Sequence, residues 1–448
     1  MNGRIEFSKD FVFGAATAAY QIEGAFNEDG KGLSIWDEFV RKKGKIKNND
    51  TGDIACDHYH RYAEDVKIMQ DLNLHAYRYS VSWPRVIPSG KGAVNEKGLD
   101  FYNRLTDELL KRNITPFVTL YHWDLPLELH RRGGWRNRDT SCAFAEYAEL
   151  MTRKLGDRVK HWITLNEPWV AMVTGYVLGV HAPGERTPFS ALRTAHNMLL
   201  AHGLALDAMR KSRSDLKIGL TNALSPVHSF RKDLTLKAEK KADAIVNRLW
   251  LDPIYHGKYP EIITKNVFSA NKGNIKQDDL KIISGKTDFL GVNHYTRMLV
   301  RNFPFPLYSF LPVVPKYEGV KFTSMGWEIY PEGMSEILGM IREDYGNPPV
   351  YITENGVSFY EKPENGRIED DNRIEYLKNY LFQCWTSVKK GSDLKGYFAW
   401  SLLDNLEWHY GFEKTFGLVH IDRNTLSRTP KKSAGWYADL CRNRGFDF

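Results

Sequence analysis

Eight short apolar runs, each followed by a longer amphipathic or polar stretch, constrain the fold of this chain more than any other feature of its sequence. Short apolar runs bounded by polar residues are typical of buried strands. Strands that alternate with helices favour a parallel sheet, and eight of them favour a closed (β/α)8 barrel. The predicted strands are Phe11–Ala16, His75–Ser80, Thr115–Leu120, His161–Leu165, Lys217–Asn222, Phe289–Val292, Val350–Ile352 and Gly396–Trp400.

Several of the stretches between these strands have the residue spacing of helices. Asn95 is predicted as an N-cap, because the apolar residues after it recur on one helical face. Two further helices are predicted over Asp57–Asp71 and Asp139–Leu155. The apolar residues that follow Asn95 at helical spacing are Leu99, Tyr102, Leu105, Leu109 and Leu110.

The main alternative to a barrel is a doubly wound open sheet. Such a sheet usually carries Gly-x-Gly-x-x-Gly after an early strand, and this sequence does not contain that motif. The length of 448 residues would by itself suggest two or three domains, but a barrel with long loops can reach this size as one domain. We therefore expect an α/β fold, a single TIM barrel with long βα loops, as one domain over residues 1–448.

The charge pattern argues against a nucleic-acid partner. The chain has 62 basic and 55 acidic residues, which leaves a net charge of +7. The densest basic run, Arg41–Lys47, contains a glycine and is typical of a solvated loop. A nucleic-acid-binding protein needs its basic residues gathered on one face, so we expect no nucleic acid among the partners.

The cysteines and the N-terminus indicate a reducing compartment. Cys56, Cys142, Cys384 and Cys441 are far apart in the sequence, so neither a zinc cluster nor a redox Cys-x-x-Cys motif is expected. The first residues lack the apolar stretch of a signal peptide. No run approaches the ~20 apolar residues of a membrane span. We expect a cytoplasmic protein that does not associate with membranes.

Residues directly after the predicted strands are the candidates for function, because TIM-barrel active sites form at the carboxyl ends of the strands. Glu167 follows the strand that ends at Leu165, and Glu354 follows the strand that ends at Ile352. The two acids are therefore expected to face one cleft. Glycoside hydrolysis needs such a pair: one acid protonates the leaving oxygen, and the other attacks the anomeric carbon or activates water.

Residues suited to binding a sugar follow the other predicted strands. Aromatic faces stack on sugar rings, while amides and carboxylates bind hydroxyls. Arg78, inside the second strand, is expected to hold one of the two acids ionised, whereas the other acid needs a raised pKa. The further strand-end candidates are Gln21, His122, Trp123, Asn166, Trp400, Glu407 and Trp408.

Four specific motifs make the chain resemble glycoside hydrolase family 1, the β-glucosidase family. The resemblance runs nearly end to end, from Phe11 to the predicted helix around Trp436. The motifs are Tyr20-Gln21-Ile22-Glu23-Gly24, Thr164-Leu165-Asn166-Glu167-Pro168, Tyr351-Ile352-Thr353-Glu354-Asn355-Gly356 and Asp404-Asn405-Leu406-Glu407-Trp408.

The resemblance implies a role for each candidate residue. Glu167 matches the family's acid/base, and Glu354 matches its nucleophile. Arg78 and Tyr295 match groups that contact the nucleophile, and Asn293 matches a position near the nucleophile and the sugar. The implied substrate-binding positions are Gln21, His122, Asn166, Glu407 and Trp408 for the glycone, Trp400 as its platform, Trp327 as the aglycone wall, and Trp123 and Phe416 beside the substrate.

These roles imply a retaining β-glycosidase that needs no metal or organic cofactor. A covalent glycosyl-enzyme forms on the nucleophile, and the two carboxyl groups are expected ~5 Å apart rather than the ~6.5–9.5 Å of an inverting enzyme. The expected substrates are terminal β-glucosides and short β-linked oligosaccharides, with β-fucosides and β-galactosides beside them.

Three alternative functions share much of this site. A transglycosylating β-glycosidase would have the same residues, because only the acceptor differs. A 6-phospho-β-glycosidase would replace the pair Glu407-Trp408, and a carboxylate at that place repels a phosphate. A non-catalytic sugar-binding protein would lack Glu167 or Glu354, and both are present.

The segment from Phe303 to Pro312 is rich in aromatic residues and proline. We expect a loop packed on the barrel rim, with a sharper hypothesis of an apolar lip for the aglycone or a contact in a homo-oligomer. Five histidines lack metal-ligand spacing and are expected to be structural. They are His58, His60, His161, His181 and His294.

Overall fold

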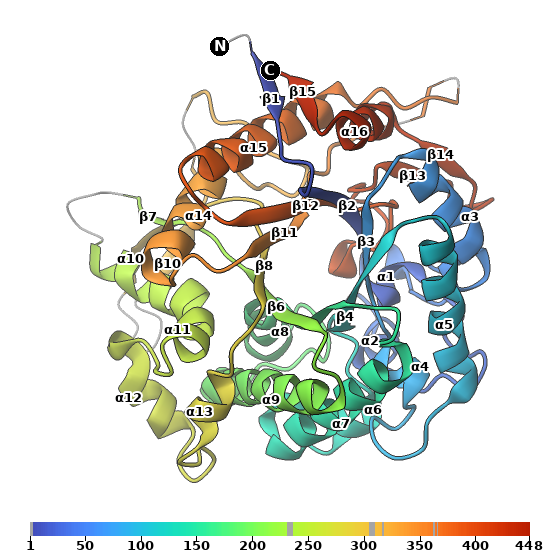
Figure 1. The fold of residues 1–448 in the computed structure, drawn as a ribbon. Coiled ribbons are helices and arrows are strands. Elements are labelled where there is room, and N and C mark those ends of the chain that lie inside the picture. Colours follow the sequence, from blue (N-terminus) through green and yellow to red (C-terminus); the bar gives the residue numbers. More distant parts are fainter. Residues whose placement is uncertain (1–2, 231–235, 304–309, 316–317, 362, 365) are drawn as a thin grey trace.

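A closed barrel of eight parallel strands forms the centre of the protein, in the order β11-β12-β2-β3-β4-β5-β6-β8 (Figure 1). The structure is a computed structural model that describes residues 3–230, 236–303, 310–315, 318–361, 363–364 and 366–448. Each predicted strand is present within three residues at either end, so the predicted TIM barrel is confirmed. The barrel strands are β2 (Val12–Ala16), β3 (Ala76–Ser80), β4 (Thr115–Tyr121), β5 (His161–Asn166), β6 (Lys217–Ala223), β8 (Phe289–Asn293), β11 (Val350–Asn355) and β12 (Leu394–Trp400).

Helices surround the barrel and cover the outer face of its strands (Figure 1). The longer ones, most of which connect successive strands, are α3 (His58–Asp71), α5 (Glu96–Lys111), α7 (Arg138–Leu155), α9 (Ala191–Ser212), α10 (Leu236–Asp243), α12 (Glu261–Ala270), α14 (Glu332–Asp344), α15 (Asp371–Lys389) and α16 (Lys432–Asn443). Shorter helices lie in the connections: α1 (Ala19–Ile22), α2 (Ile35–Phe39), α4 (Trp83–Val86), α6 (Leu127–Arg131), α8 (Pro168–Met172), α11 (Leu249–Tyr255) and α13 (Asp279–Ile283). Among the described residues, none of these helices has the length and apolar character needed to cross a membrane.

Small sheets outside the barrel tie the ends and loops of the chain together. Strands β1 (Arg4–Glu6) and β15 (Gly445–Asp447) pair antiparallel and bring the two ends of the chain side by side (Figure 1). Strands β13 (Val419–Ile421) and β14 (Arg428–Pro430) form a second pair, and β7 (Val227–Ser229), β9 (Met298–Asn302) and β10 (Phe310–Val313) form a third sheet.

The predicted helices α3, α5 and α7 are confirmed, and so is the predicted N-cap position of Asn95. Asn95 does occupy the N-cap position of α5, yet its side chain caps no backbone amide there. Its amide nitrogen instead donates to the carbonyl oxygens of Asp29 and Arg85, each at 2.8 Å. The side chain therefore ties the loop at Asp29 and helix α4 to the start of α5, and only the tertiary fold provides these partners.

The structure contradicts part of the prediction of a loop over Phe303–Pro312. Its residues 304–309 lie outside the described part of the chain, but Phe310–Pro312 belong to strand β10. This strand pairs antiparallel with β9, with Phe310 opposite Asn302. The ring of Phe310 packs against a small buried cluster that includes Val300, and this burial stabilises a strand where composition predicted a loop.

Aromatic rings close the amino end of the barrel. The ring of Phe117 lies 4.2 Å from that of His161, 5.0 Å from Phe398 and 5.2 Å from Tyr351, measured between ring centroids. Gly14 makes room for this packing, because a Cβ atom there would lie 2.6 Å from the Phe398 ring and 2.5 Å from a backbone oxygen of β3. The filled amino end leaves only the carboxyl ends of the strands open to a ligand, as is usual in TIM barrels.

Candidate active site

Glu167 and Glu354 line the same cavity, which lies at the carboxyl ends of the barrel strands and has a volume of about 370 Å³. Glu354 is within β11, and Glu167 follows β5 directly, at the N-cap of α8. Both side chains are buried. Strand β8 lies beside β11, with Asn293 opposite Glu354. The two acids therefore enter the cavity from different strands, with polar side chains such as Asn293 between them.

Glu354 is paired with the one cation that reaches it among the described residues. Arg78 from β3 donates to Oε1 at 2.5 Å, and the Tyr295 hydroxyl donates to Oε2 at 2.8 Å. Burial raises the pKa of Glu354, while the positive charge of Arg78 and the two hydrogen bonds lower that pKa. Arg78 and the two hydrogen bonds therefore make Glu354 easier to ionise than a carboxyl group that is only buried.

Glu167 has no cation in contact. Asn293 donates to its Oε1 at 2.7 Å. Burial raises the pKa of Glu167 to about 8, and the negative charge of Glu354 adds to the rise. The two acids titrate as a coupled pair. At neutral pH the proton of this pair stays on Glu167, because only Glu354 is ion-paired with Arg78.

A framework of polar side chains behind the cavity holds the two acids in place. The Asn166 amide oxygen accepts from Arg78 at 2.6 Å and from Asn293 at 3.1 Å. Thr353 donates to the Asn293 amide oxygen at 2.7 Å, which orients the Asn293 nitrogen toward Glu167. Arg78, Asn166 and Asn293 are buried behind the described lining of the cavity. Arg78 and Asn293 contact the acids directly, and Asn166 bonds both of them and His122.

One end of the cavity offers buried polar atoms that have no partner among the described residues. They are Oε1 of Gln21, Nδ1 of His122 and Oε2 of Glu407. The Gln21 nitrogen donates to Asn405 and to the Leu406 carbonyl, at 3.0 and 2.8 Å, which fixes the amide. Burial, with the charge of Glu354, raises the pKa of Glu407 to about 8. Buried polar atoms are normally hydrogen-bonded, so these three are suited to the hydroxyls of a bound sugar.

Aromatic rings surround this polar end. The His122 ring stacks on that of Trp400 at 5.8 Å, and the Trp123 ring lies 4.6 Å from that of Trp408. Trp123, Glu167 and Trp408 each have a positive φ, of 79°, 46° and 47°. Such backbone conformations cost about 1–3 kcal/mol each and cluster at functional sites. The packing of the rings against one another holds this strained backbone.

Tyr295, Trp327 and Phe416 form the wall of the other end of the cavity. The Trp327 ring lies 5.3 Å from that of Tyr295 and 6.2 Å from that of Phe416. Of the candidates from the sequence, ten line the cavity, and Gln21, Arg78, Asn166 and Asn293 lie behind its surface. The ten are His122, Trp123, Glu167, Tyr295, Trp327, Glu354, Trp400, Glu407, Trp408 and Phe416.

Sequence reasoning missed about as many lining residues, most of them apolar. Trp169 and Met325 stand two residues from Glu167 and Trp327, and that proximity was the only signal for them. The others lie in loops, in short helices or at strand ends, as Ala223 in β6 and Met298 in β9 do, where an apolar residue cannot be told from one of the core. The missed lining residues are Trp169, Val170, Thr174, Val180, His181, Ala223, Thr296, Met298, Met325, His409 and Tyr410.

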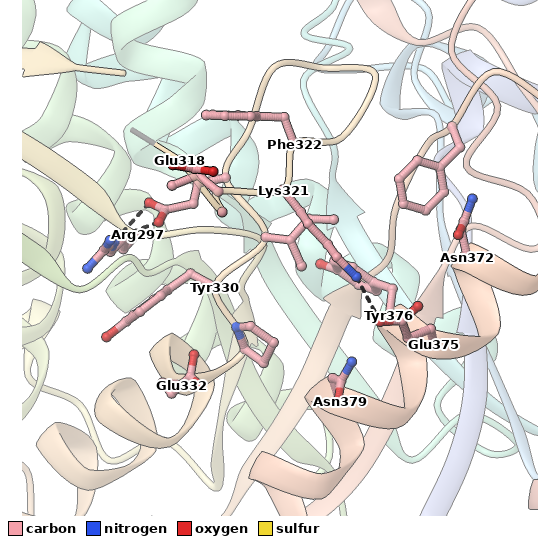
Figure 2. A pocket seen from close by; sticks show the side chains of 16 residues that line it. Arg297, Glu318, Lys321, Phe322, Tyr330, Glu332, Asn372, Glu375, Tyr376 and Asn379 are labelled. Carbon is pink, nitrogen blue, oxygen red and sulfur yellow. Dashed lines mark hydrogen bonds and ion pairs between the residues drawn. The ribbon is translucent and has the colours of Figure 1, made fainter. Parts of the chain in front are cut away.

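A larger hollow, of about 790 Å³, lies at the surface and shares the segment 321–329 with the cavity wall (Figure 2). Its charged groups pair with each other: Arg297 with Glu328 at 2.8 Å, and Lys321 with Glu375 at 3.1 Å. None of the candidate residues lines it. The volume of a hollow therefore does not by itself identify the active site. The smaller cavity is the candidate, because it contains the two carboxylates, Glu167 and Glu354.

Two of the histidines that were expected to be structural, His58 and His294, have buried contacts within the protein. His58 bonds Asp65 at 2.7 Å, and His294 contacts the Leu224 carbonyl oxygen at 2.9 Å. No group of three or more His, Cys, Asp or Glu side chains in the described ranges is arranged to hold a metal ion. The four cysteines are free thiols, of which only Cys142 is exposed.

Comparison with known proteins places this geometry in a family. The model of the family "Glycosyl hydrolase family 1" matches residues 4–446. The chain is 46% identical to a "Beta-glucosidase A" of Acetivibrio thermocellus, over 99% of this chain and 100% of that protein. It is 41% identical to a "Bifunctional beta-D-glucosidase/beta-D-fucosidase" of Bifidobacterium breve, over 96% and 97% of the two chains.

A solved structure is similar throughout. The β-glucosidase from Thermotoga maritima in complex with deoxynojirimycin superposes with a TM-score of 0.93, at 45% identity, over 99% of this chain and 100% of that one. Sequence and structure agree over nearly the whole length, and the chain belongs to glycosyl hydrolase family 1.

Proposed function

We propose that this protein is a retaining β-glycosidase that removes terminal non-reducing β-D-glucosyl residues, with Glu354 as the nucleophile and Glu167 as the acid/base. The observation that carries the proposal is the unequal environment of the two acids. Glu354 is ion-paired with Arg78 and accepts from Tyr295, whereas Glu167 contacts an amide and has a pKa raised to about 8 by burial.

Each step of the reaction follows from these protonation states. The Glu354 carboxylate attacks the anomeric carbon, and the bond from that carbon to the leaving oxygen breaks as Glu167 protonates this oxygen. Glu167, now ionised, takes a proton from water as the water oxygen displaces Glu354 from the sugar. Two displacements at one carbon retain the β configuration.

The polar end of the cavity suits an unmodified sugar. The orphan atoms of Gln21, His122 and Glu407 offer partners to hydroxyls, and the relative from Bifidobacterium breve is named for action on both β-glucosides and β-fucosides. We therefore extend the proposal to β-fucosides and β-galactosides. Glucose and galactose differ only in the orientation of the C4 hydroxyl, and fucose further lacks the C6 hydroxyl, so the same three side chains would discriminate among them.

A phosphorylated sugar is disfavoured by the charges of the site. Glu167, Glu354 and Glu407 line the cavity, and no lysine or arginine is among its described lining residues. A phosphate dianion would therefore meet acids without a compensating cation. Transglycosylation uses the same residues and the same intermediate, and a product analysis with an alcohol acceptor separates it from hydrolysis.

Replacement of each acid tests the assignment. Glu354→Gly is expected to lower kcat roughly a thousandfold or more, and azide should partly restore turnover with formation of the α-glycosyl azide, because azide attacks the substrate directly. Glu167→Gly, with an aryl glucoside that needs no acid, should instead give the β-glycosyl azide from the covalent intermediate. Full activity of Glu354→Gly, or the same azide anomer from both variants, would contradict the proposed roles.

Three further points stay predictions: that the 448 residues act as one catalytic domain, that the protein is cytoplasmic, and that it forms a homo-oligomer. Buried thiols such as Cys384 and Cys441 are consistent with a reducing compartment. Light scattering of the purified chain measures the oligomeric state.

A further inference from the structure

The larger hollow at the surface of the protein has features of a ligand site of its own. Its volume of about 790 Å³ falls in the range of about 300–1,000 Å³ that ligand pockets occupy. The loop at 318–322, the start of α14 and one face of α15 form its walls (Figure 2). We name it the surface hollow.

A short hairpin separates the surface hollow from the catalytic cavity. The Thr323 amide donates to the Trp327 carbonyl oxygen at 2.9 Å, and the Thr323 hydroxyl accepts from the Trp327 amide at 3.3 Å. Phe322 and Glu328 pair as a β-bridge at the open end of this hairpin, and both line the surface hollow. Trp327 at its tip lines the cavity instead. The two sites are therefore neighbours with separate walls.

The charges of the surface hollow exclude a small anion. Arg297 and Lys321 are the cations among its described lining residues, and each is ion-paired with a glutamate of the same hollow, at 2.8 and 3.1 Å. Glu318 and Glu332 are exposed and have no ion pair among the described residues. A phosphate or carboxylate would therefore meet acids without a free cation, and the hollow is suited to a neutral ligand.

Helix α15 supplies neutral hydrogen-bonding groups to the surface hollow. Asn372 and Asn379 lie on one face of the helix on either side of Glu375 (Figure 2). Neither amide side chain has a hydrogen-bond partner among the described residues. An amide both donates and accepts, as sugar hydroxyls do. The two asparagines are two turns apart, about 10 Å along the helix axis. A single pyranose ring is shorter than this, so a sugar ligand that contacts both amides is at least a disaccharide.

Three aromatic rings supply the apolar part of the surface hollow. Phe322 is 37% exposed, and Tyr330 and Phe359 are partly buried. The Arg297 guanidinium lies 4.1 Å from the centroid of the Tyr330 ring, which fixes the orientation of that ring. One face of a β-glucosyl ring carries mainly C–H groups, and burial of such a face against an aromatic ring is favourable.

We propose that the surface hollow is a second carbohydrate-binding site, which holds a neutral β-linked gluco-oligosaccharide of two or more sugars outside the catalytic cavity. Phe322 stacks on one sugar, and the amides of Asn372 and Asn379 bind hydroxyls of successive sugars. The choice of a β-linked chain rests on the proposed function, because a site one hairpin away from the acids raises the local concentration of the chains that the enzyme cleaves.

Calorimetric titration with thio-linked cellotetraose tests the proposal, because sulfur in place of each bridging oxygen keeps the ligand intact. We expect two molecules to bind per chain, one in the cavity and one in the surface hollow. Phe322→Ala should weaken the second binding roughly tenfold or more. The control Phe268→Ala removes a ring of α12 that is 46% exposed and lines neither site, so it should change neither affinity. One molecule per chain, bound equally by all three proteins, overturns the proposal.

Asn372→Ala tests the same site without loss of aromatic surface. It should weaken the second binding roughly three- to tenfold, whereas Asn424→Ala, at another exposed asparagine, should not. Two bound molecules with unchanged affinities in both hollow variants would place the second molecule elsewhere and contradict the proposal. A single bound molecule that Phe322→Ala displaces would leave the surface site standing and would instead count against the proposed function of the cavity.

Discussion

At the scale of single residues, two glutamates of the same type have different environments. Arg78 is ion-paired with Glu354 and not with Glu167, so its charge opposes the effect of burial through direct contact only at Glu354 and acts on Glu167 without an ion pair. Asn293 stands between them, since its nitrogen donates to Glu167 at 2.7 Å and its hydrogen bonding lowers the pKa of both acids. The pH dependence of the enzyme should therefore respond to this one amide.

Asn293→Ala is expected to move both limbs of the pH profile of kcat/KM to higher pH. A hydrogen bond to a carboxylate favours its ionised form, so loss of the amide raises the pKa of Glu354, which sets the acidic limb, and of Glu167, which sets the basic limb. The expected shift is about one pH unit.

The measurement is the profile of initial rates on one β-glucoside between pH 4 and 10, beside that of the exposed control Asn424→Ala. A shift of either limb to lower pH would show that Asn293 does not act through the two carboxylates.

At the scale of elements, two helices hold the segment that carries the sugar-binding residues. We name residues 401–418 the glycone loop. Lys431, directly before α16, donates to Asp404 at 2.9 Å, and Asp404 also accepts from the Gly417 amide at 2.8 Å. Arg373 of α15 donates to the carbonyl oxygens of Thr415 and Phe416, at 2.9 and 3.3 Å. Both cations are buried, so they fix both ends of the loop that presents Glu407 and Trp408.

Lys431→Met should destabilise the protein by about 3–5 kcal/mol, because it leaves the buried Asp404 carboxylate without its lysine. It should also raise KM for a β-glucoside more than it lowers kcat, because the loop binds the glycone and does not carry the reacting acids. The adjacent Lys432→Met is the matched control.

Lys432 has a side chain that is 46% exposed and pairs with surface acids, and such pairs contribute about 0–1 kcal/mol. Urea denaturation and steady-state kinetics measure the two effects. Equal stability of the two variants would rule out a role for the buried pair.

At the scale of the whole molecule, the barrel is sealed at one end and open at the other. The rings of Phe117, His161, Tyr351 and Phe398 occupy the amino end, and the paired acids occupy the carboxyl end. The sealed end depends on close approach between strands, for which Gly14 leaves the space. The floor below the acids is therefore built of packed rings, of which those of Phe117 and Phe398 are buried.

Gly14→Ala is expected to destabilise the protein by about 3 kcal/mol, because the added methyl group would overlap the Phe398 ring and a neighbouring strand. Gly339→Ala makes the same change in α14, where a Cβ atom meets nothing within 4 Å. That control should gain about 0.5–1 kcal/mol, as alanine favours helix. Thermal unfolding of both variants measures the difference, and an equal or higher Tm for Gly14→Ala would refute the packing argument.

Much of the fold was open to prediction, because strand burial and helix periodicity are local properties. The eight strands and the helices α3, α5 and α7 follow from such patterns. The side-chain partners of Asn95 could not be predicted, and the loop predicted at Phe310–Pro312 is a strand. In both cases a partner far away in the sequence decides the outcome: the loop at Asp29 for Asn95, and strand β9 for Phe310.

The sequence by itself determined that the chain forms a barrel and which kinds of side chain stand at the ends of its strands. Both depend on alternating patterns and motifs, which are properties of residues that are neighbours along the chain. The family resemblance pairs Arg78 with Glu354, but only the tertiary structure brings these two residues together across 276 positions. It also decided how firmly each acid holds its proton, because a pKa depends on burial and on distances to charges. It also decided which apolar residues line the cavity, among them Trp169 in α8, Ala223 in β6 and Met325 in a loop. They carry no common pattern in the sequence, and only closure of the barrel brings them to one wall.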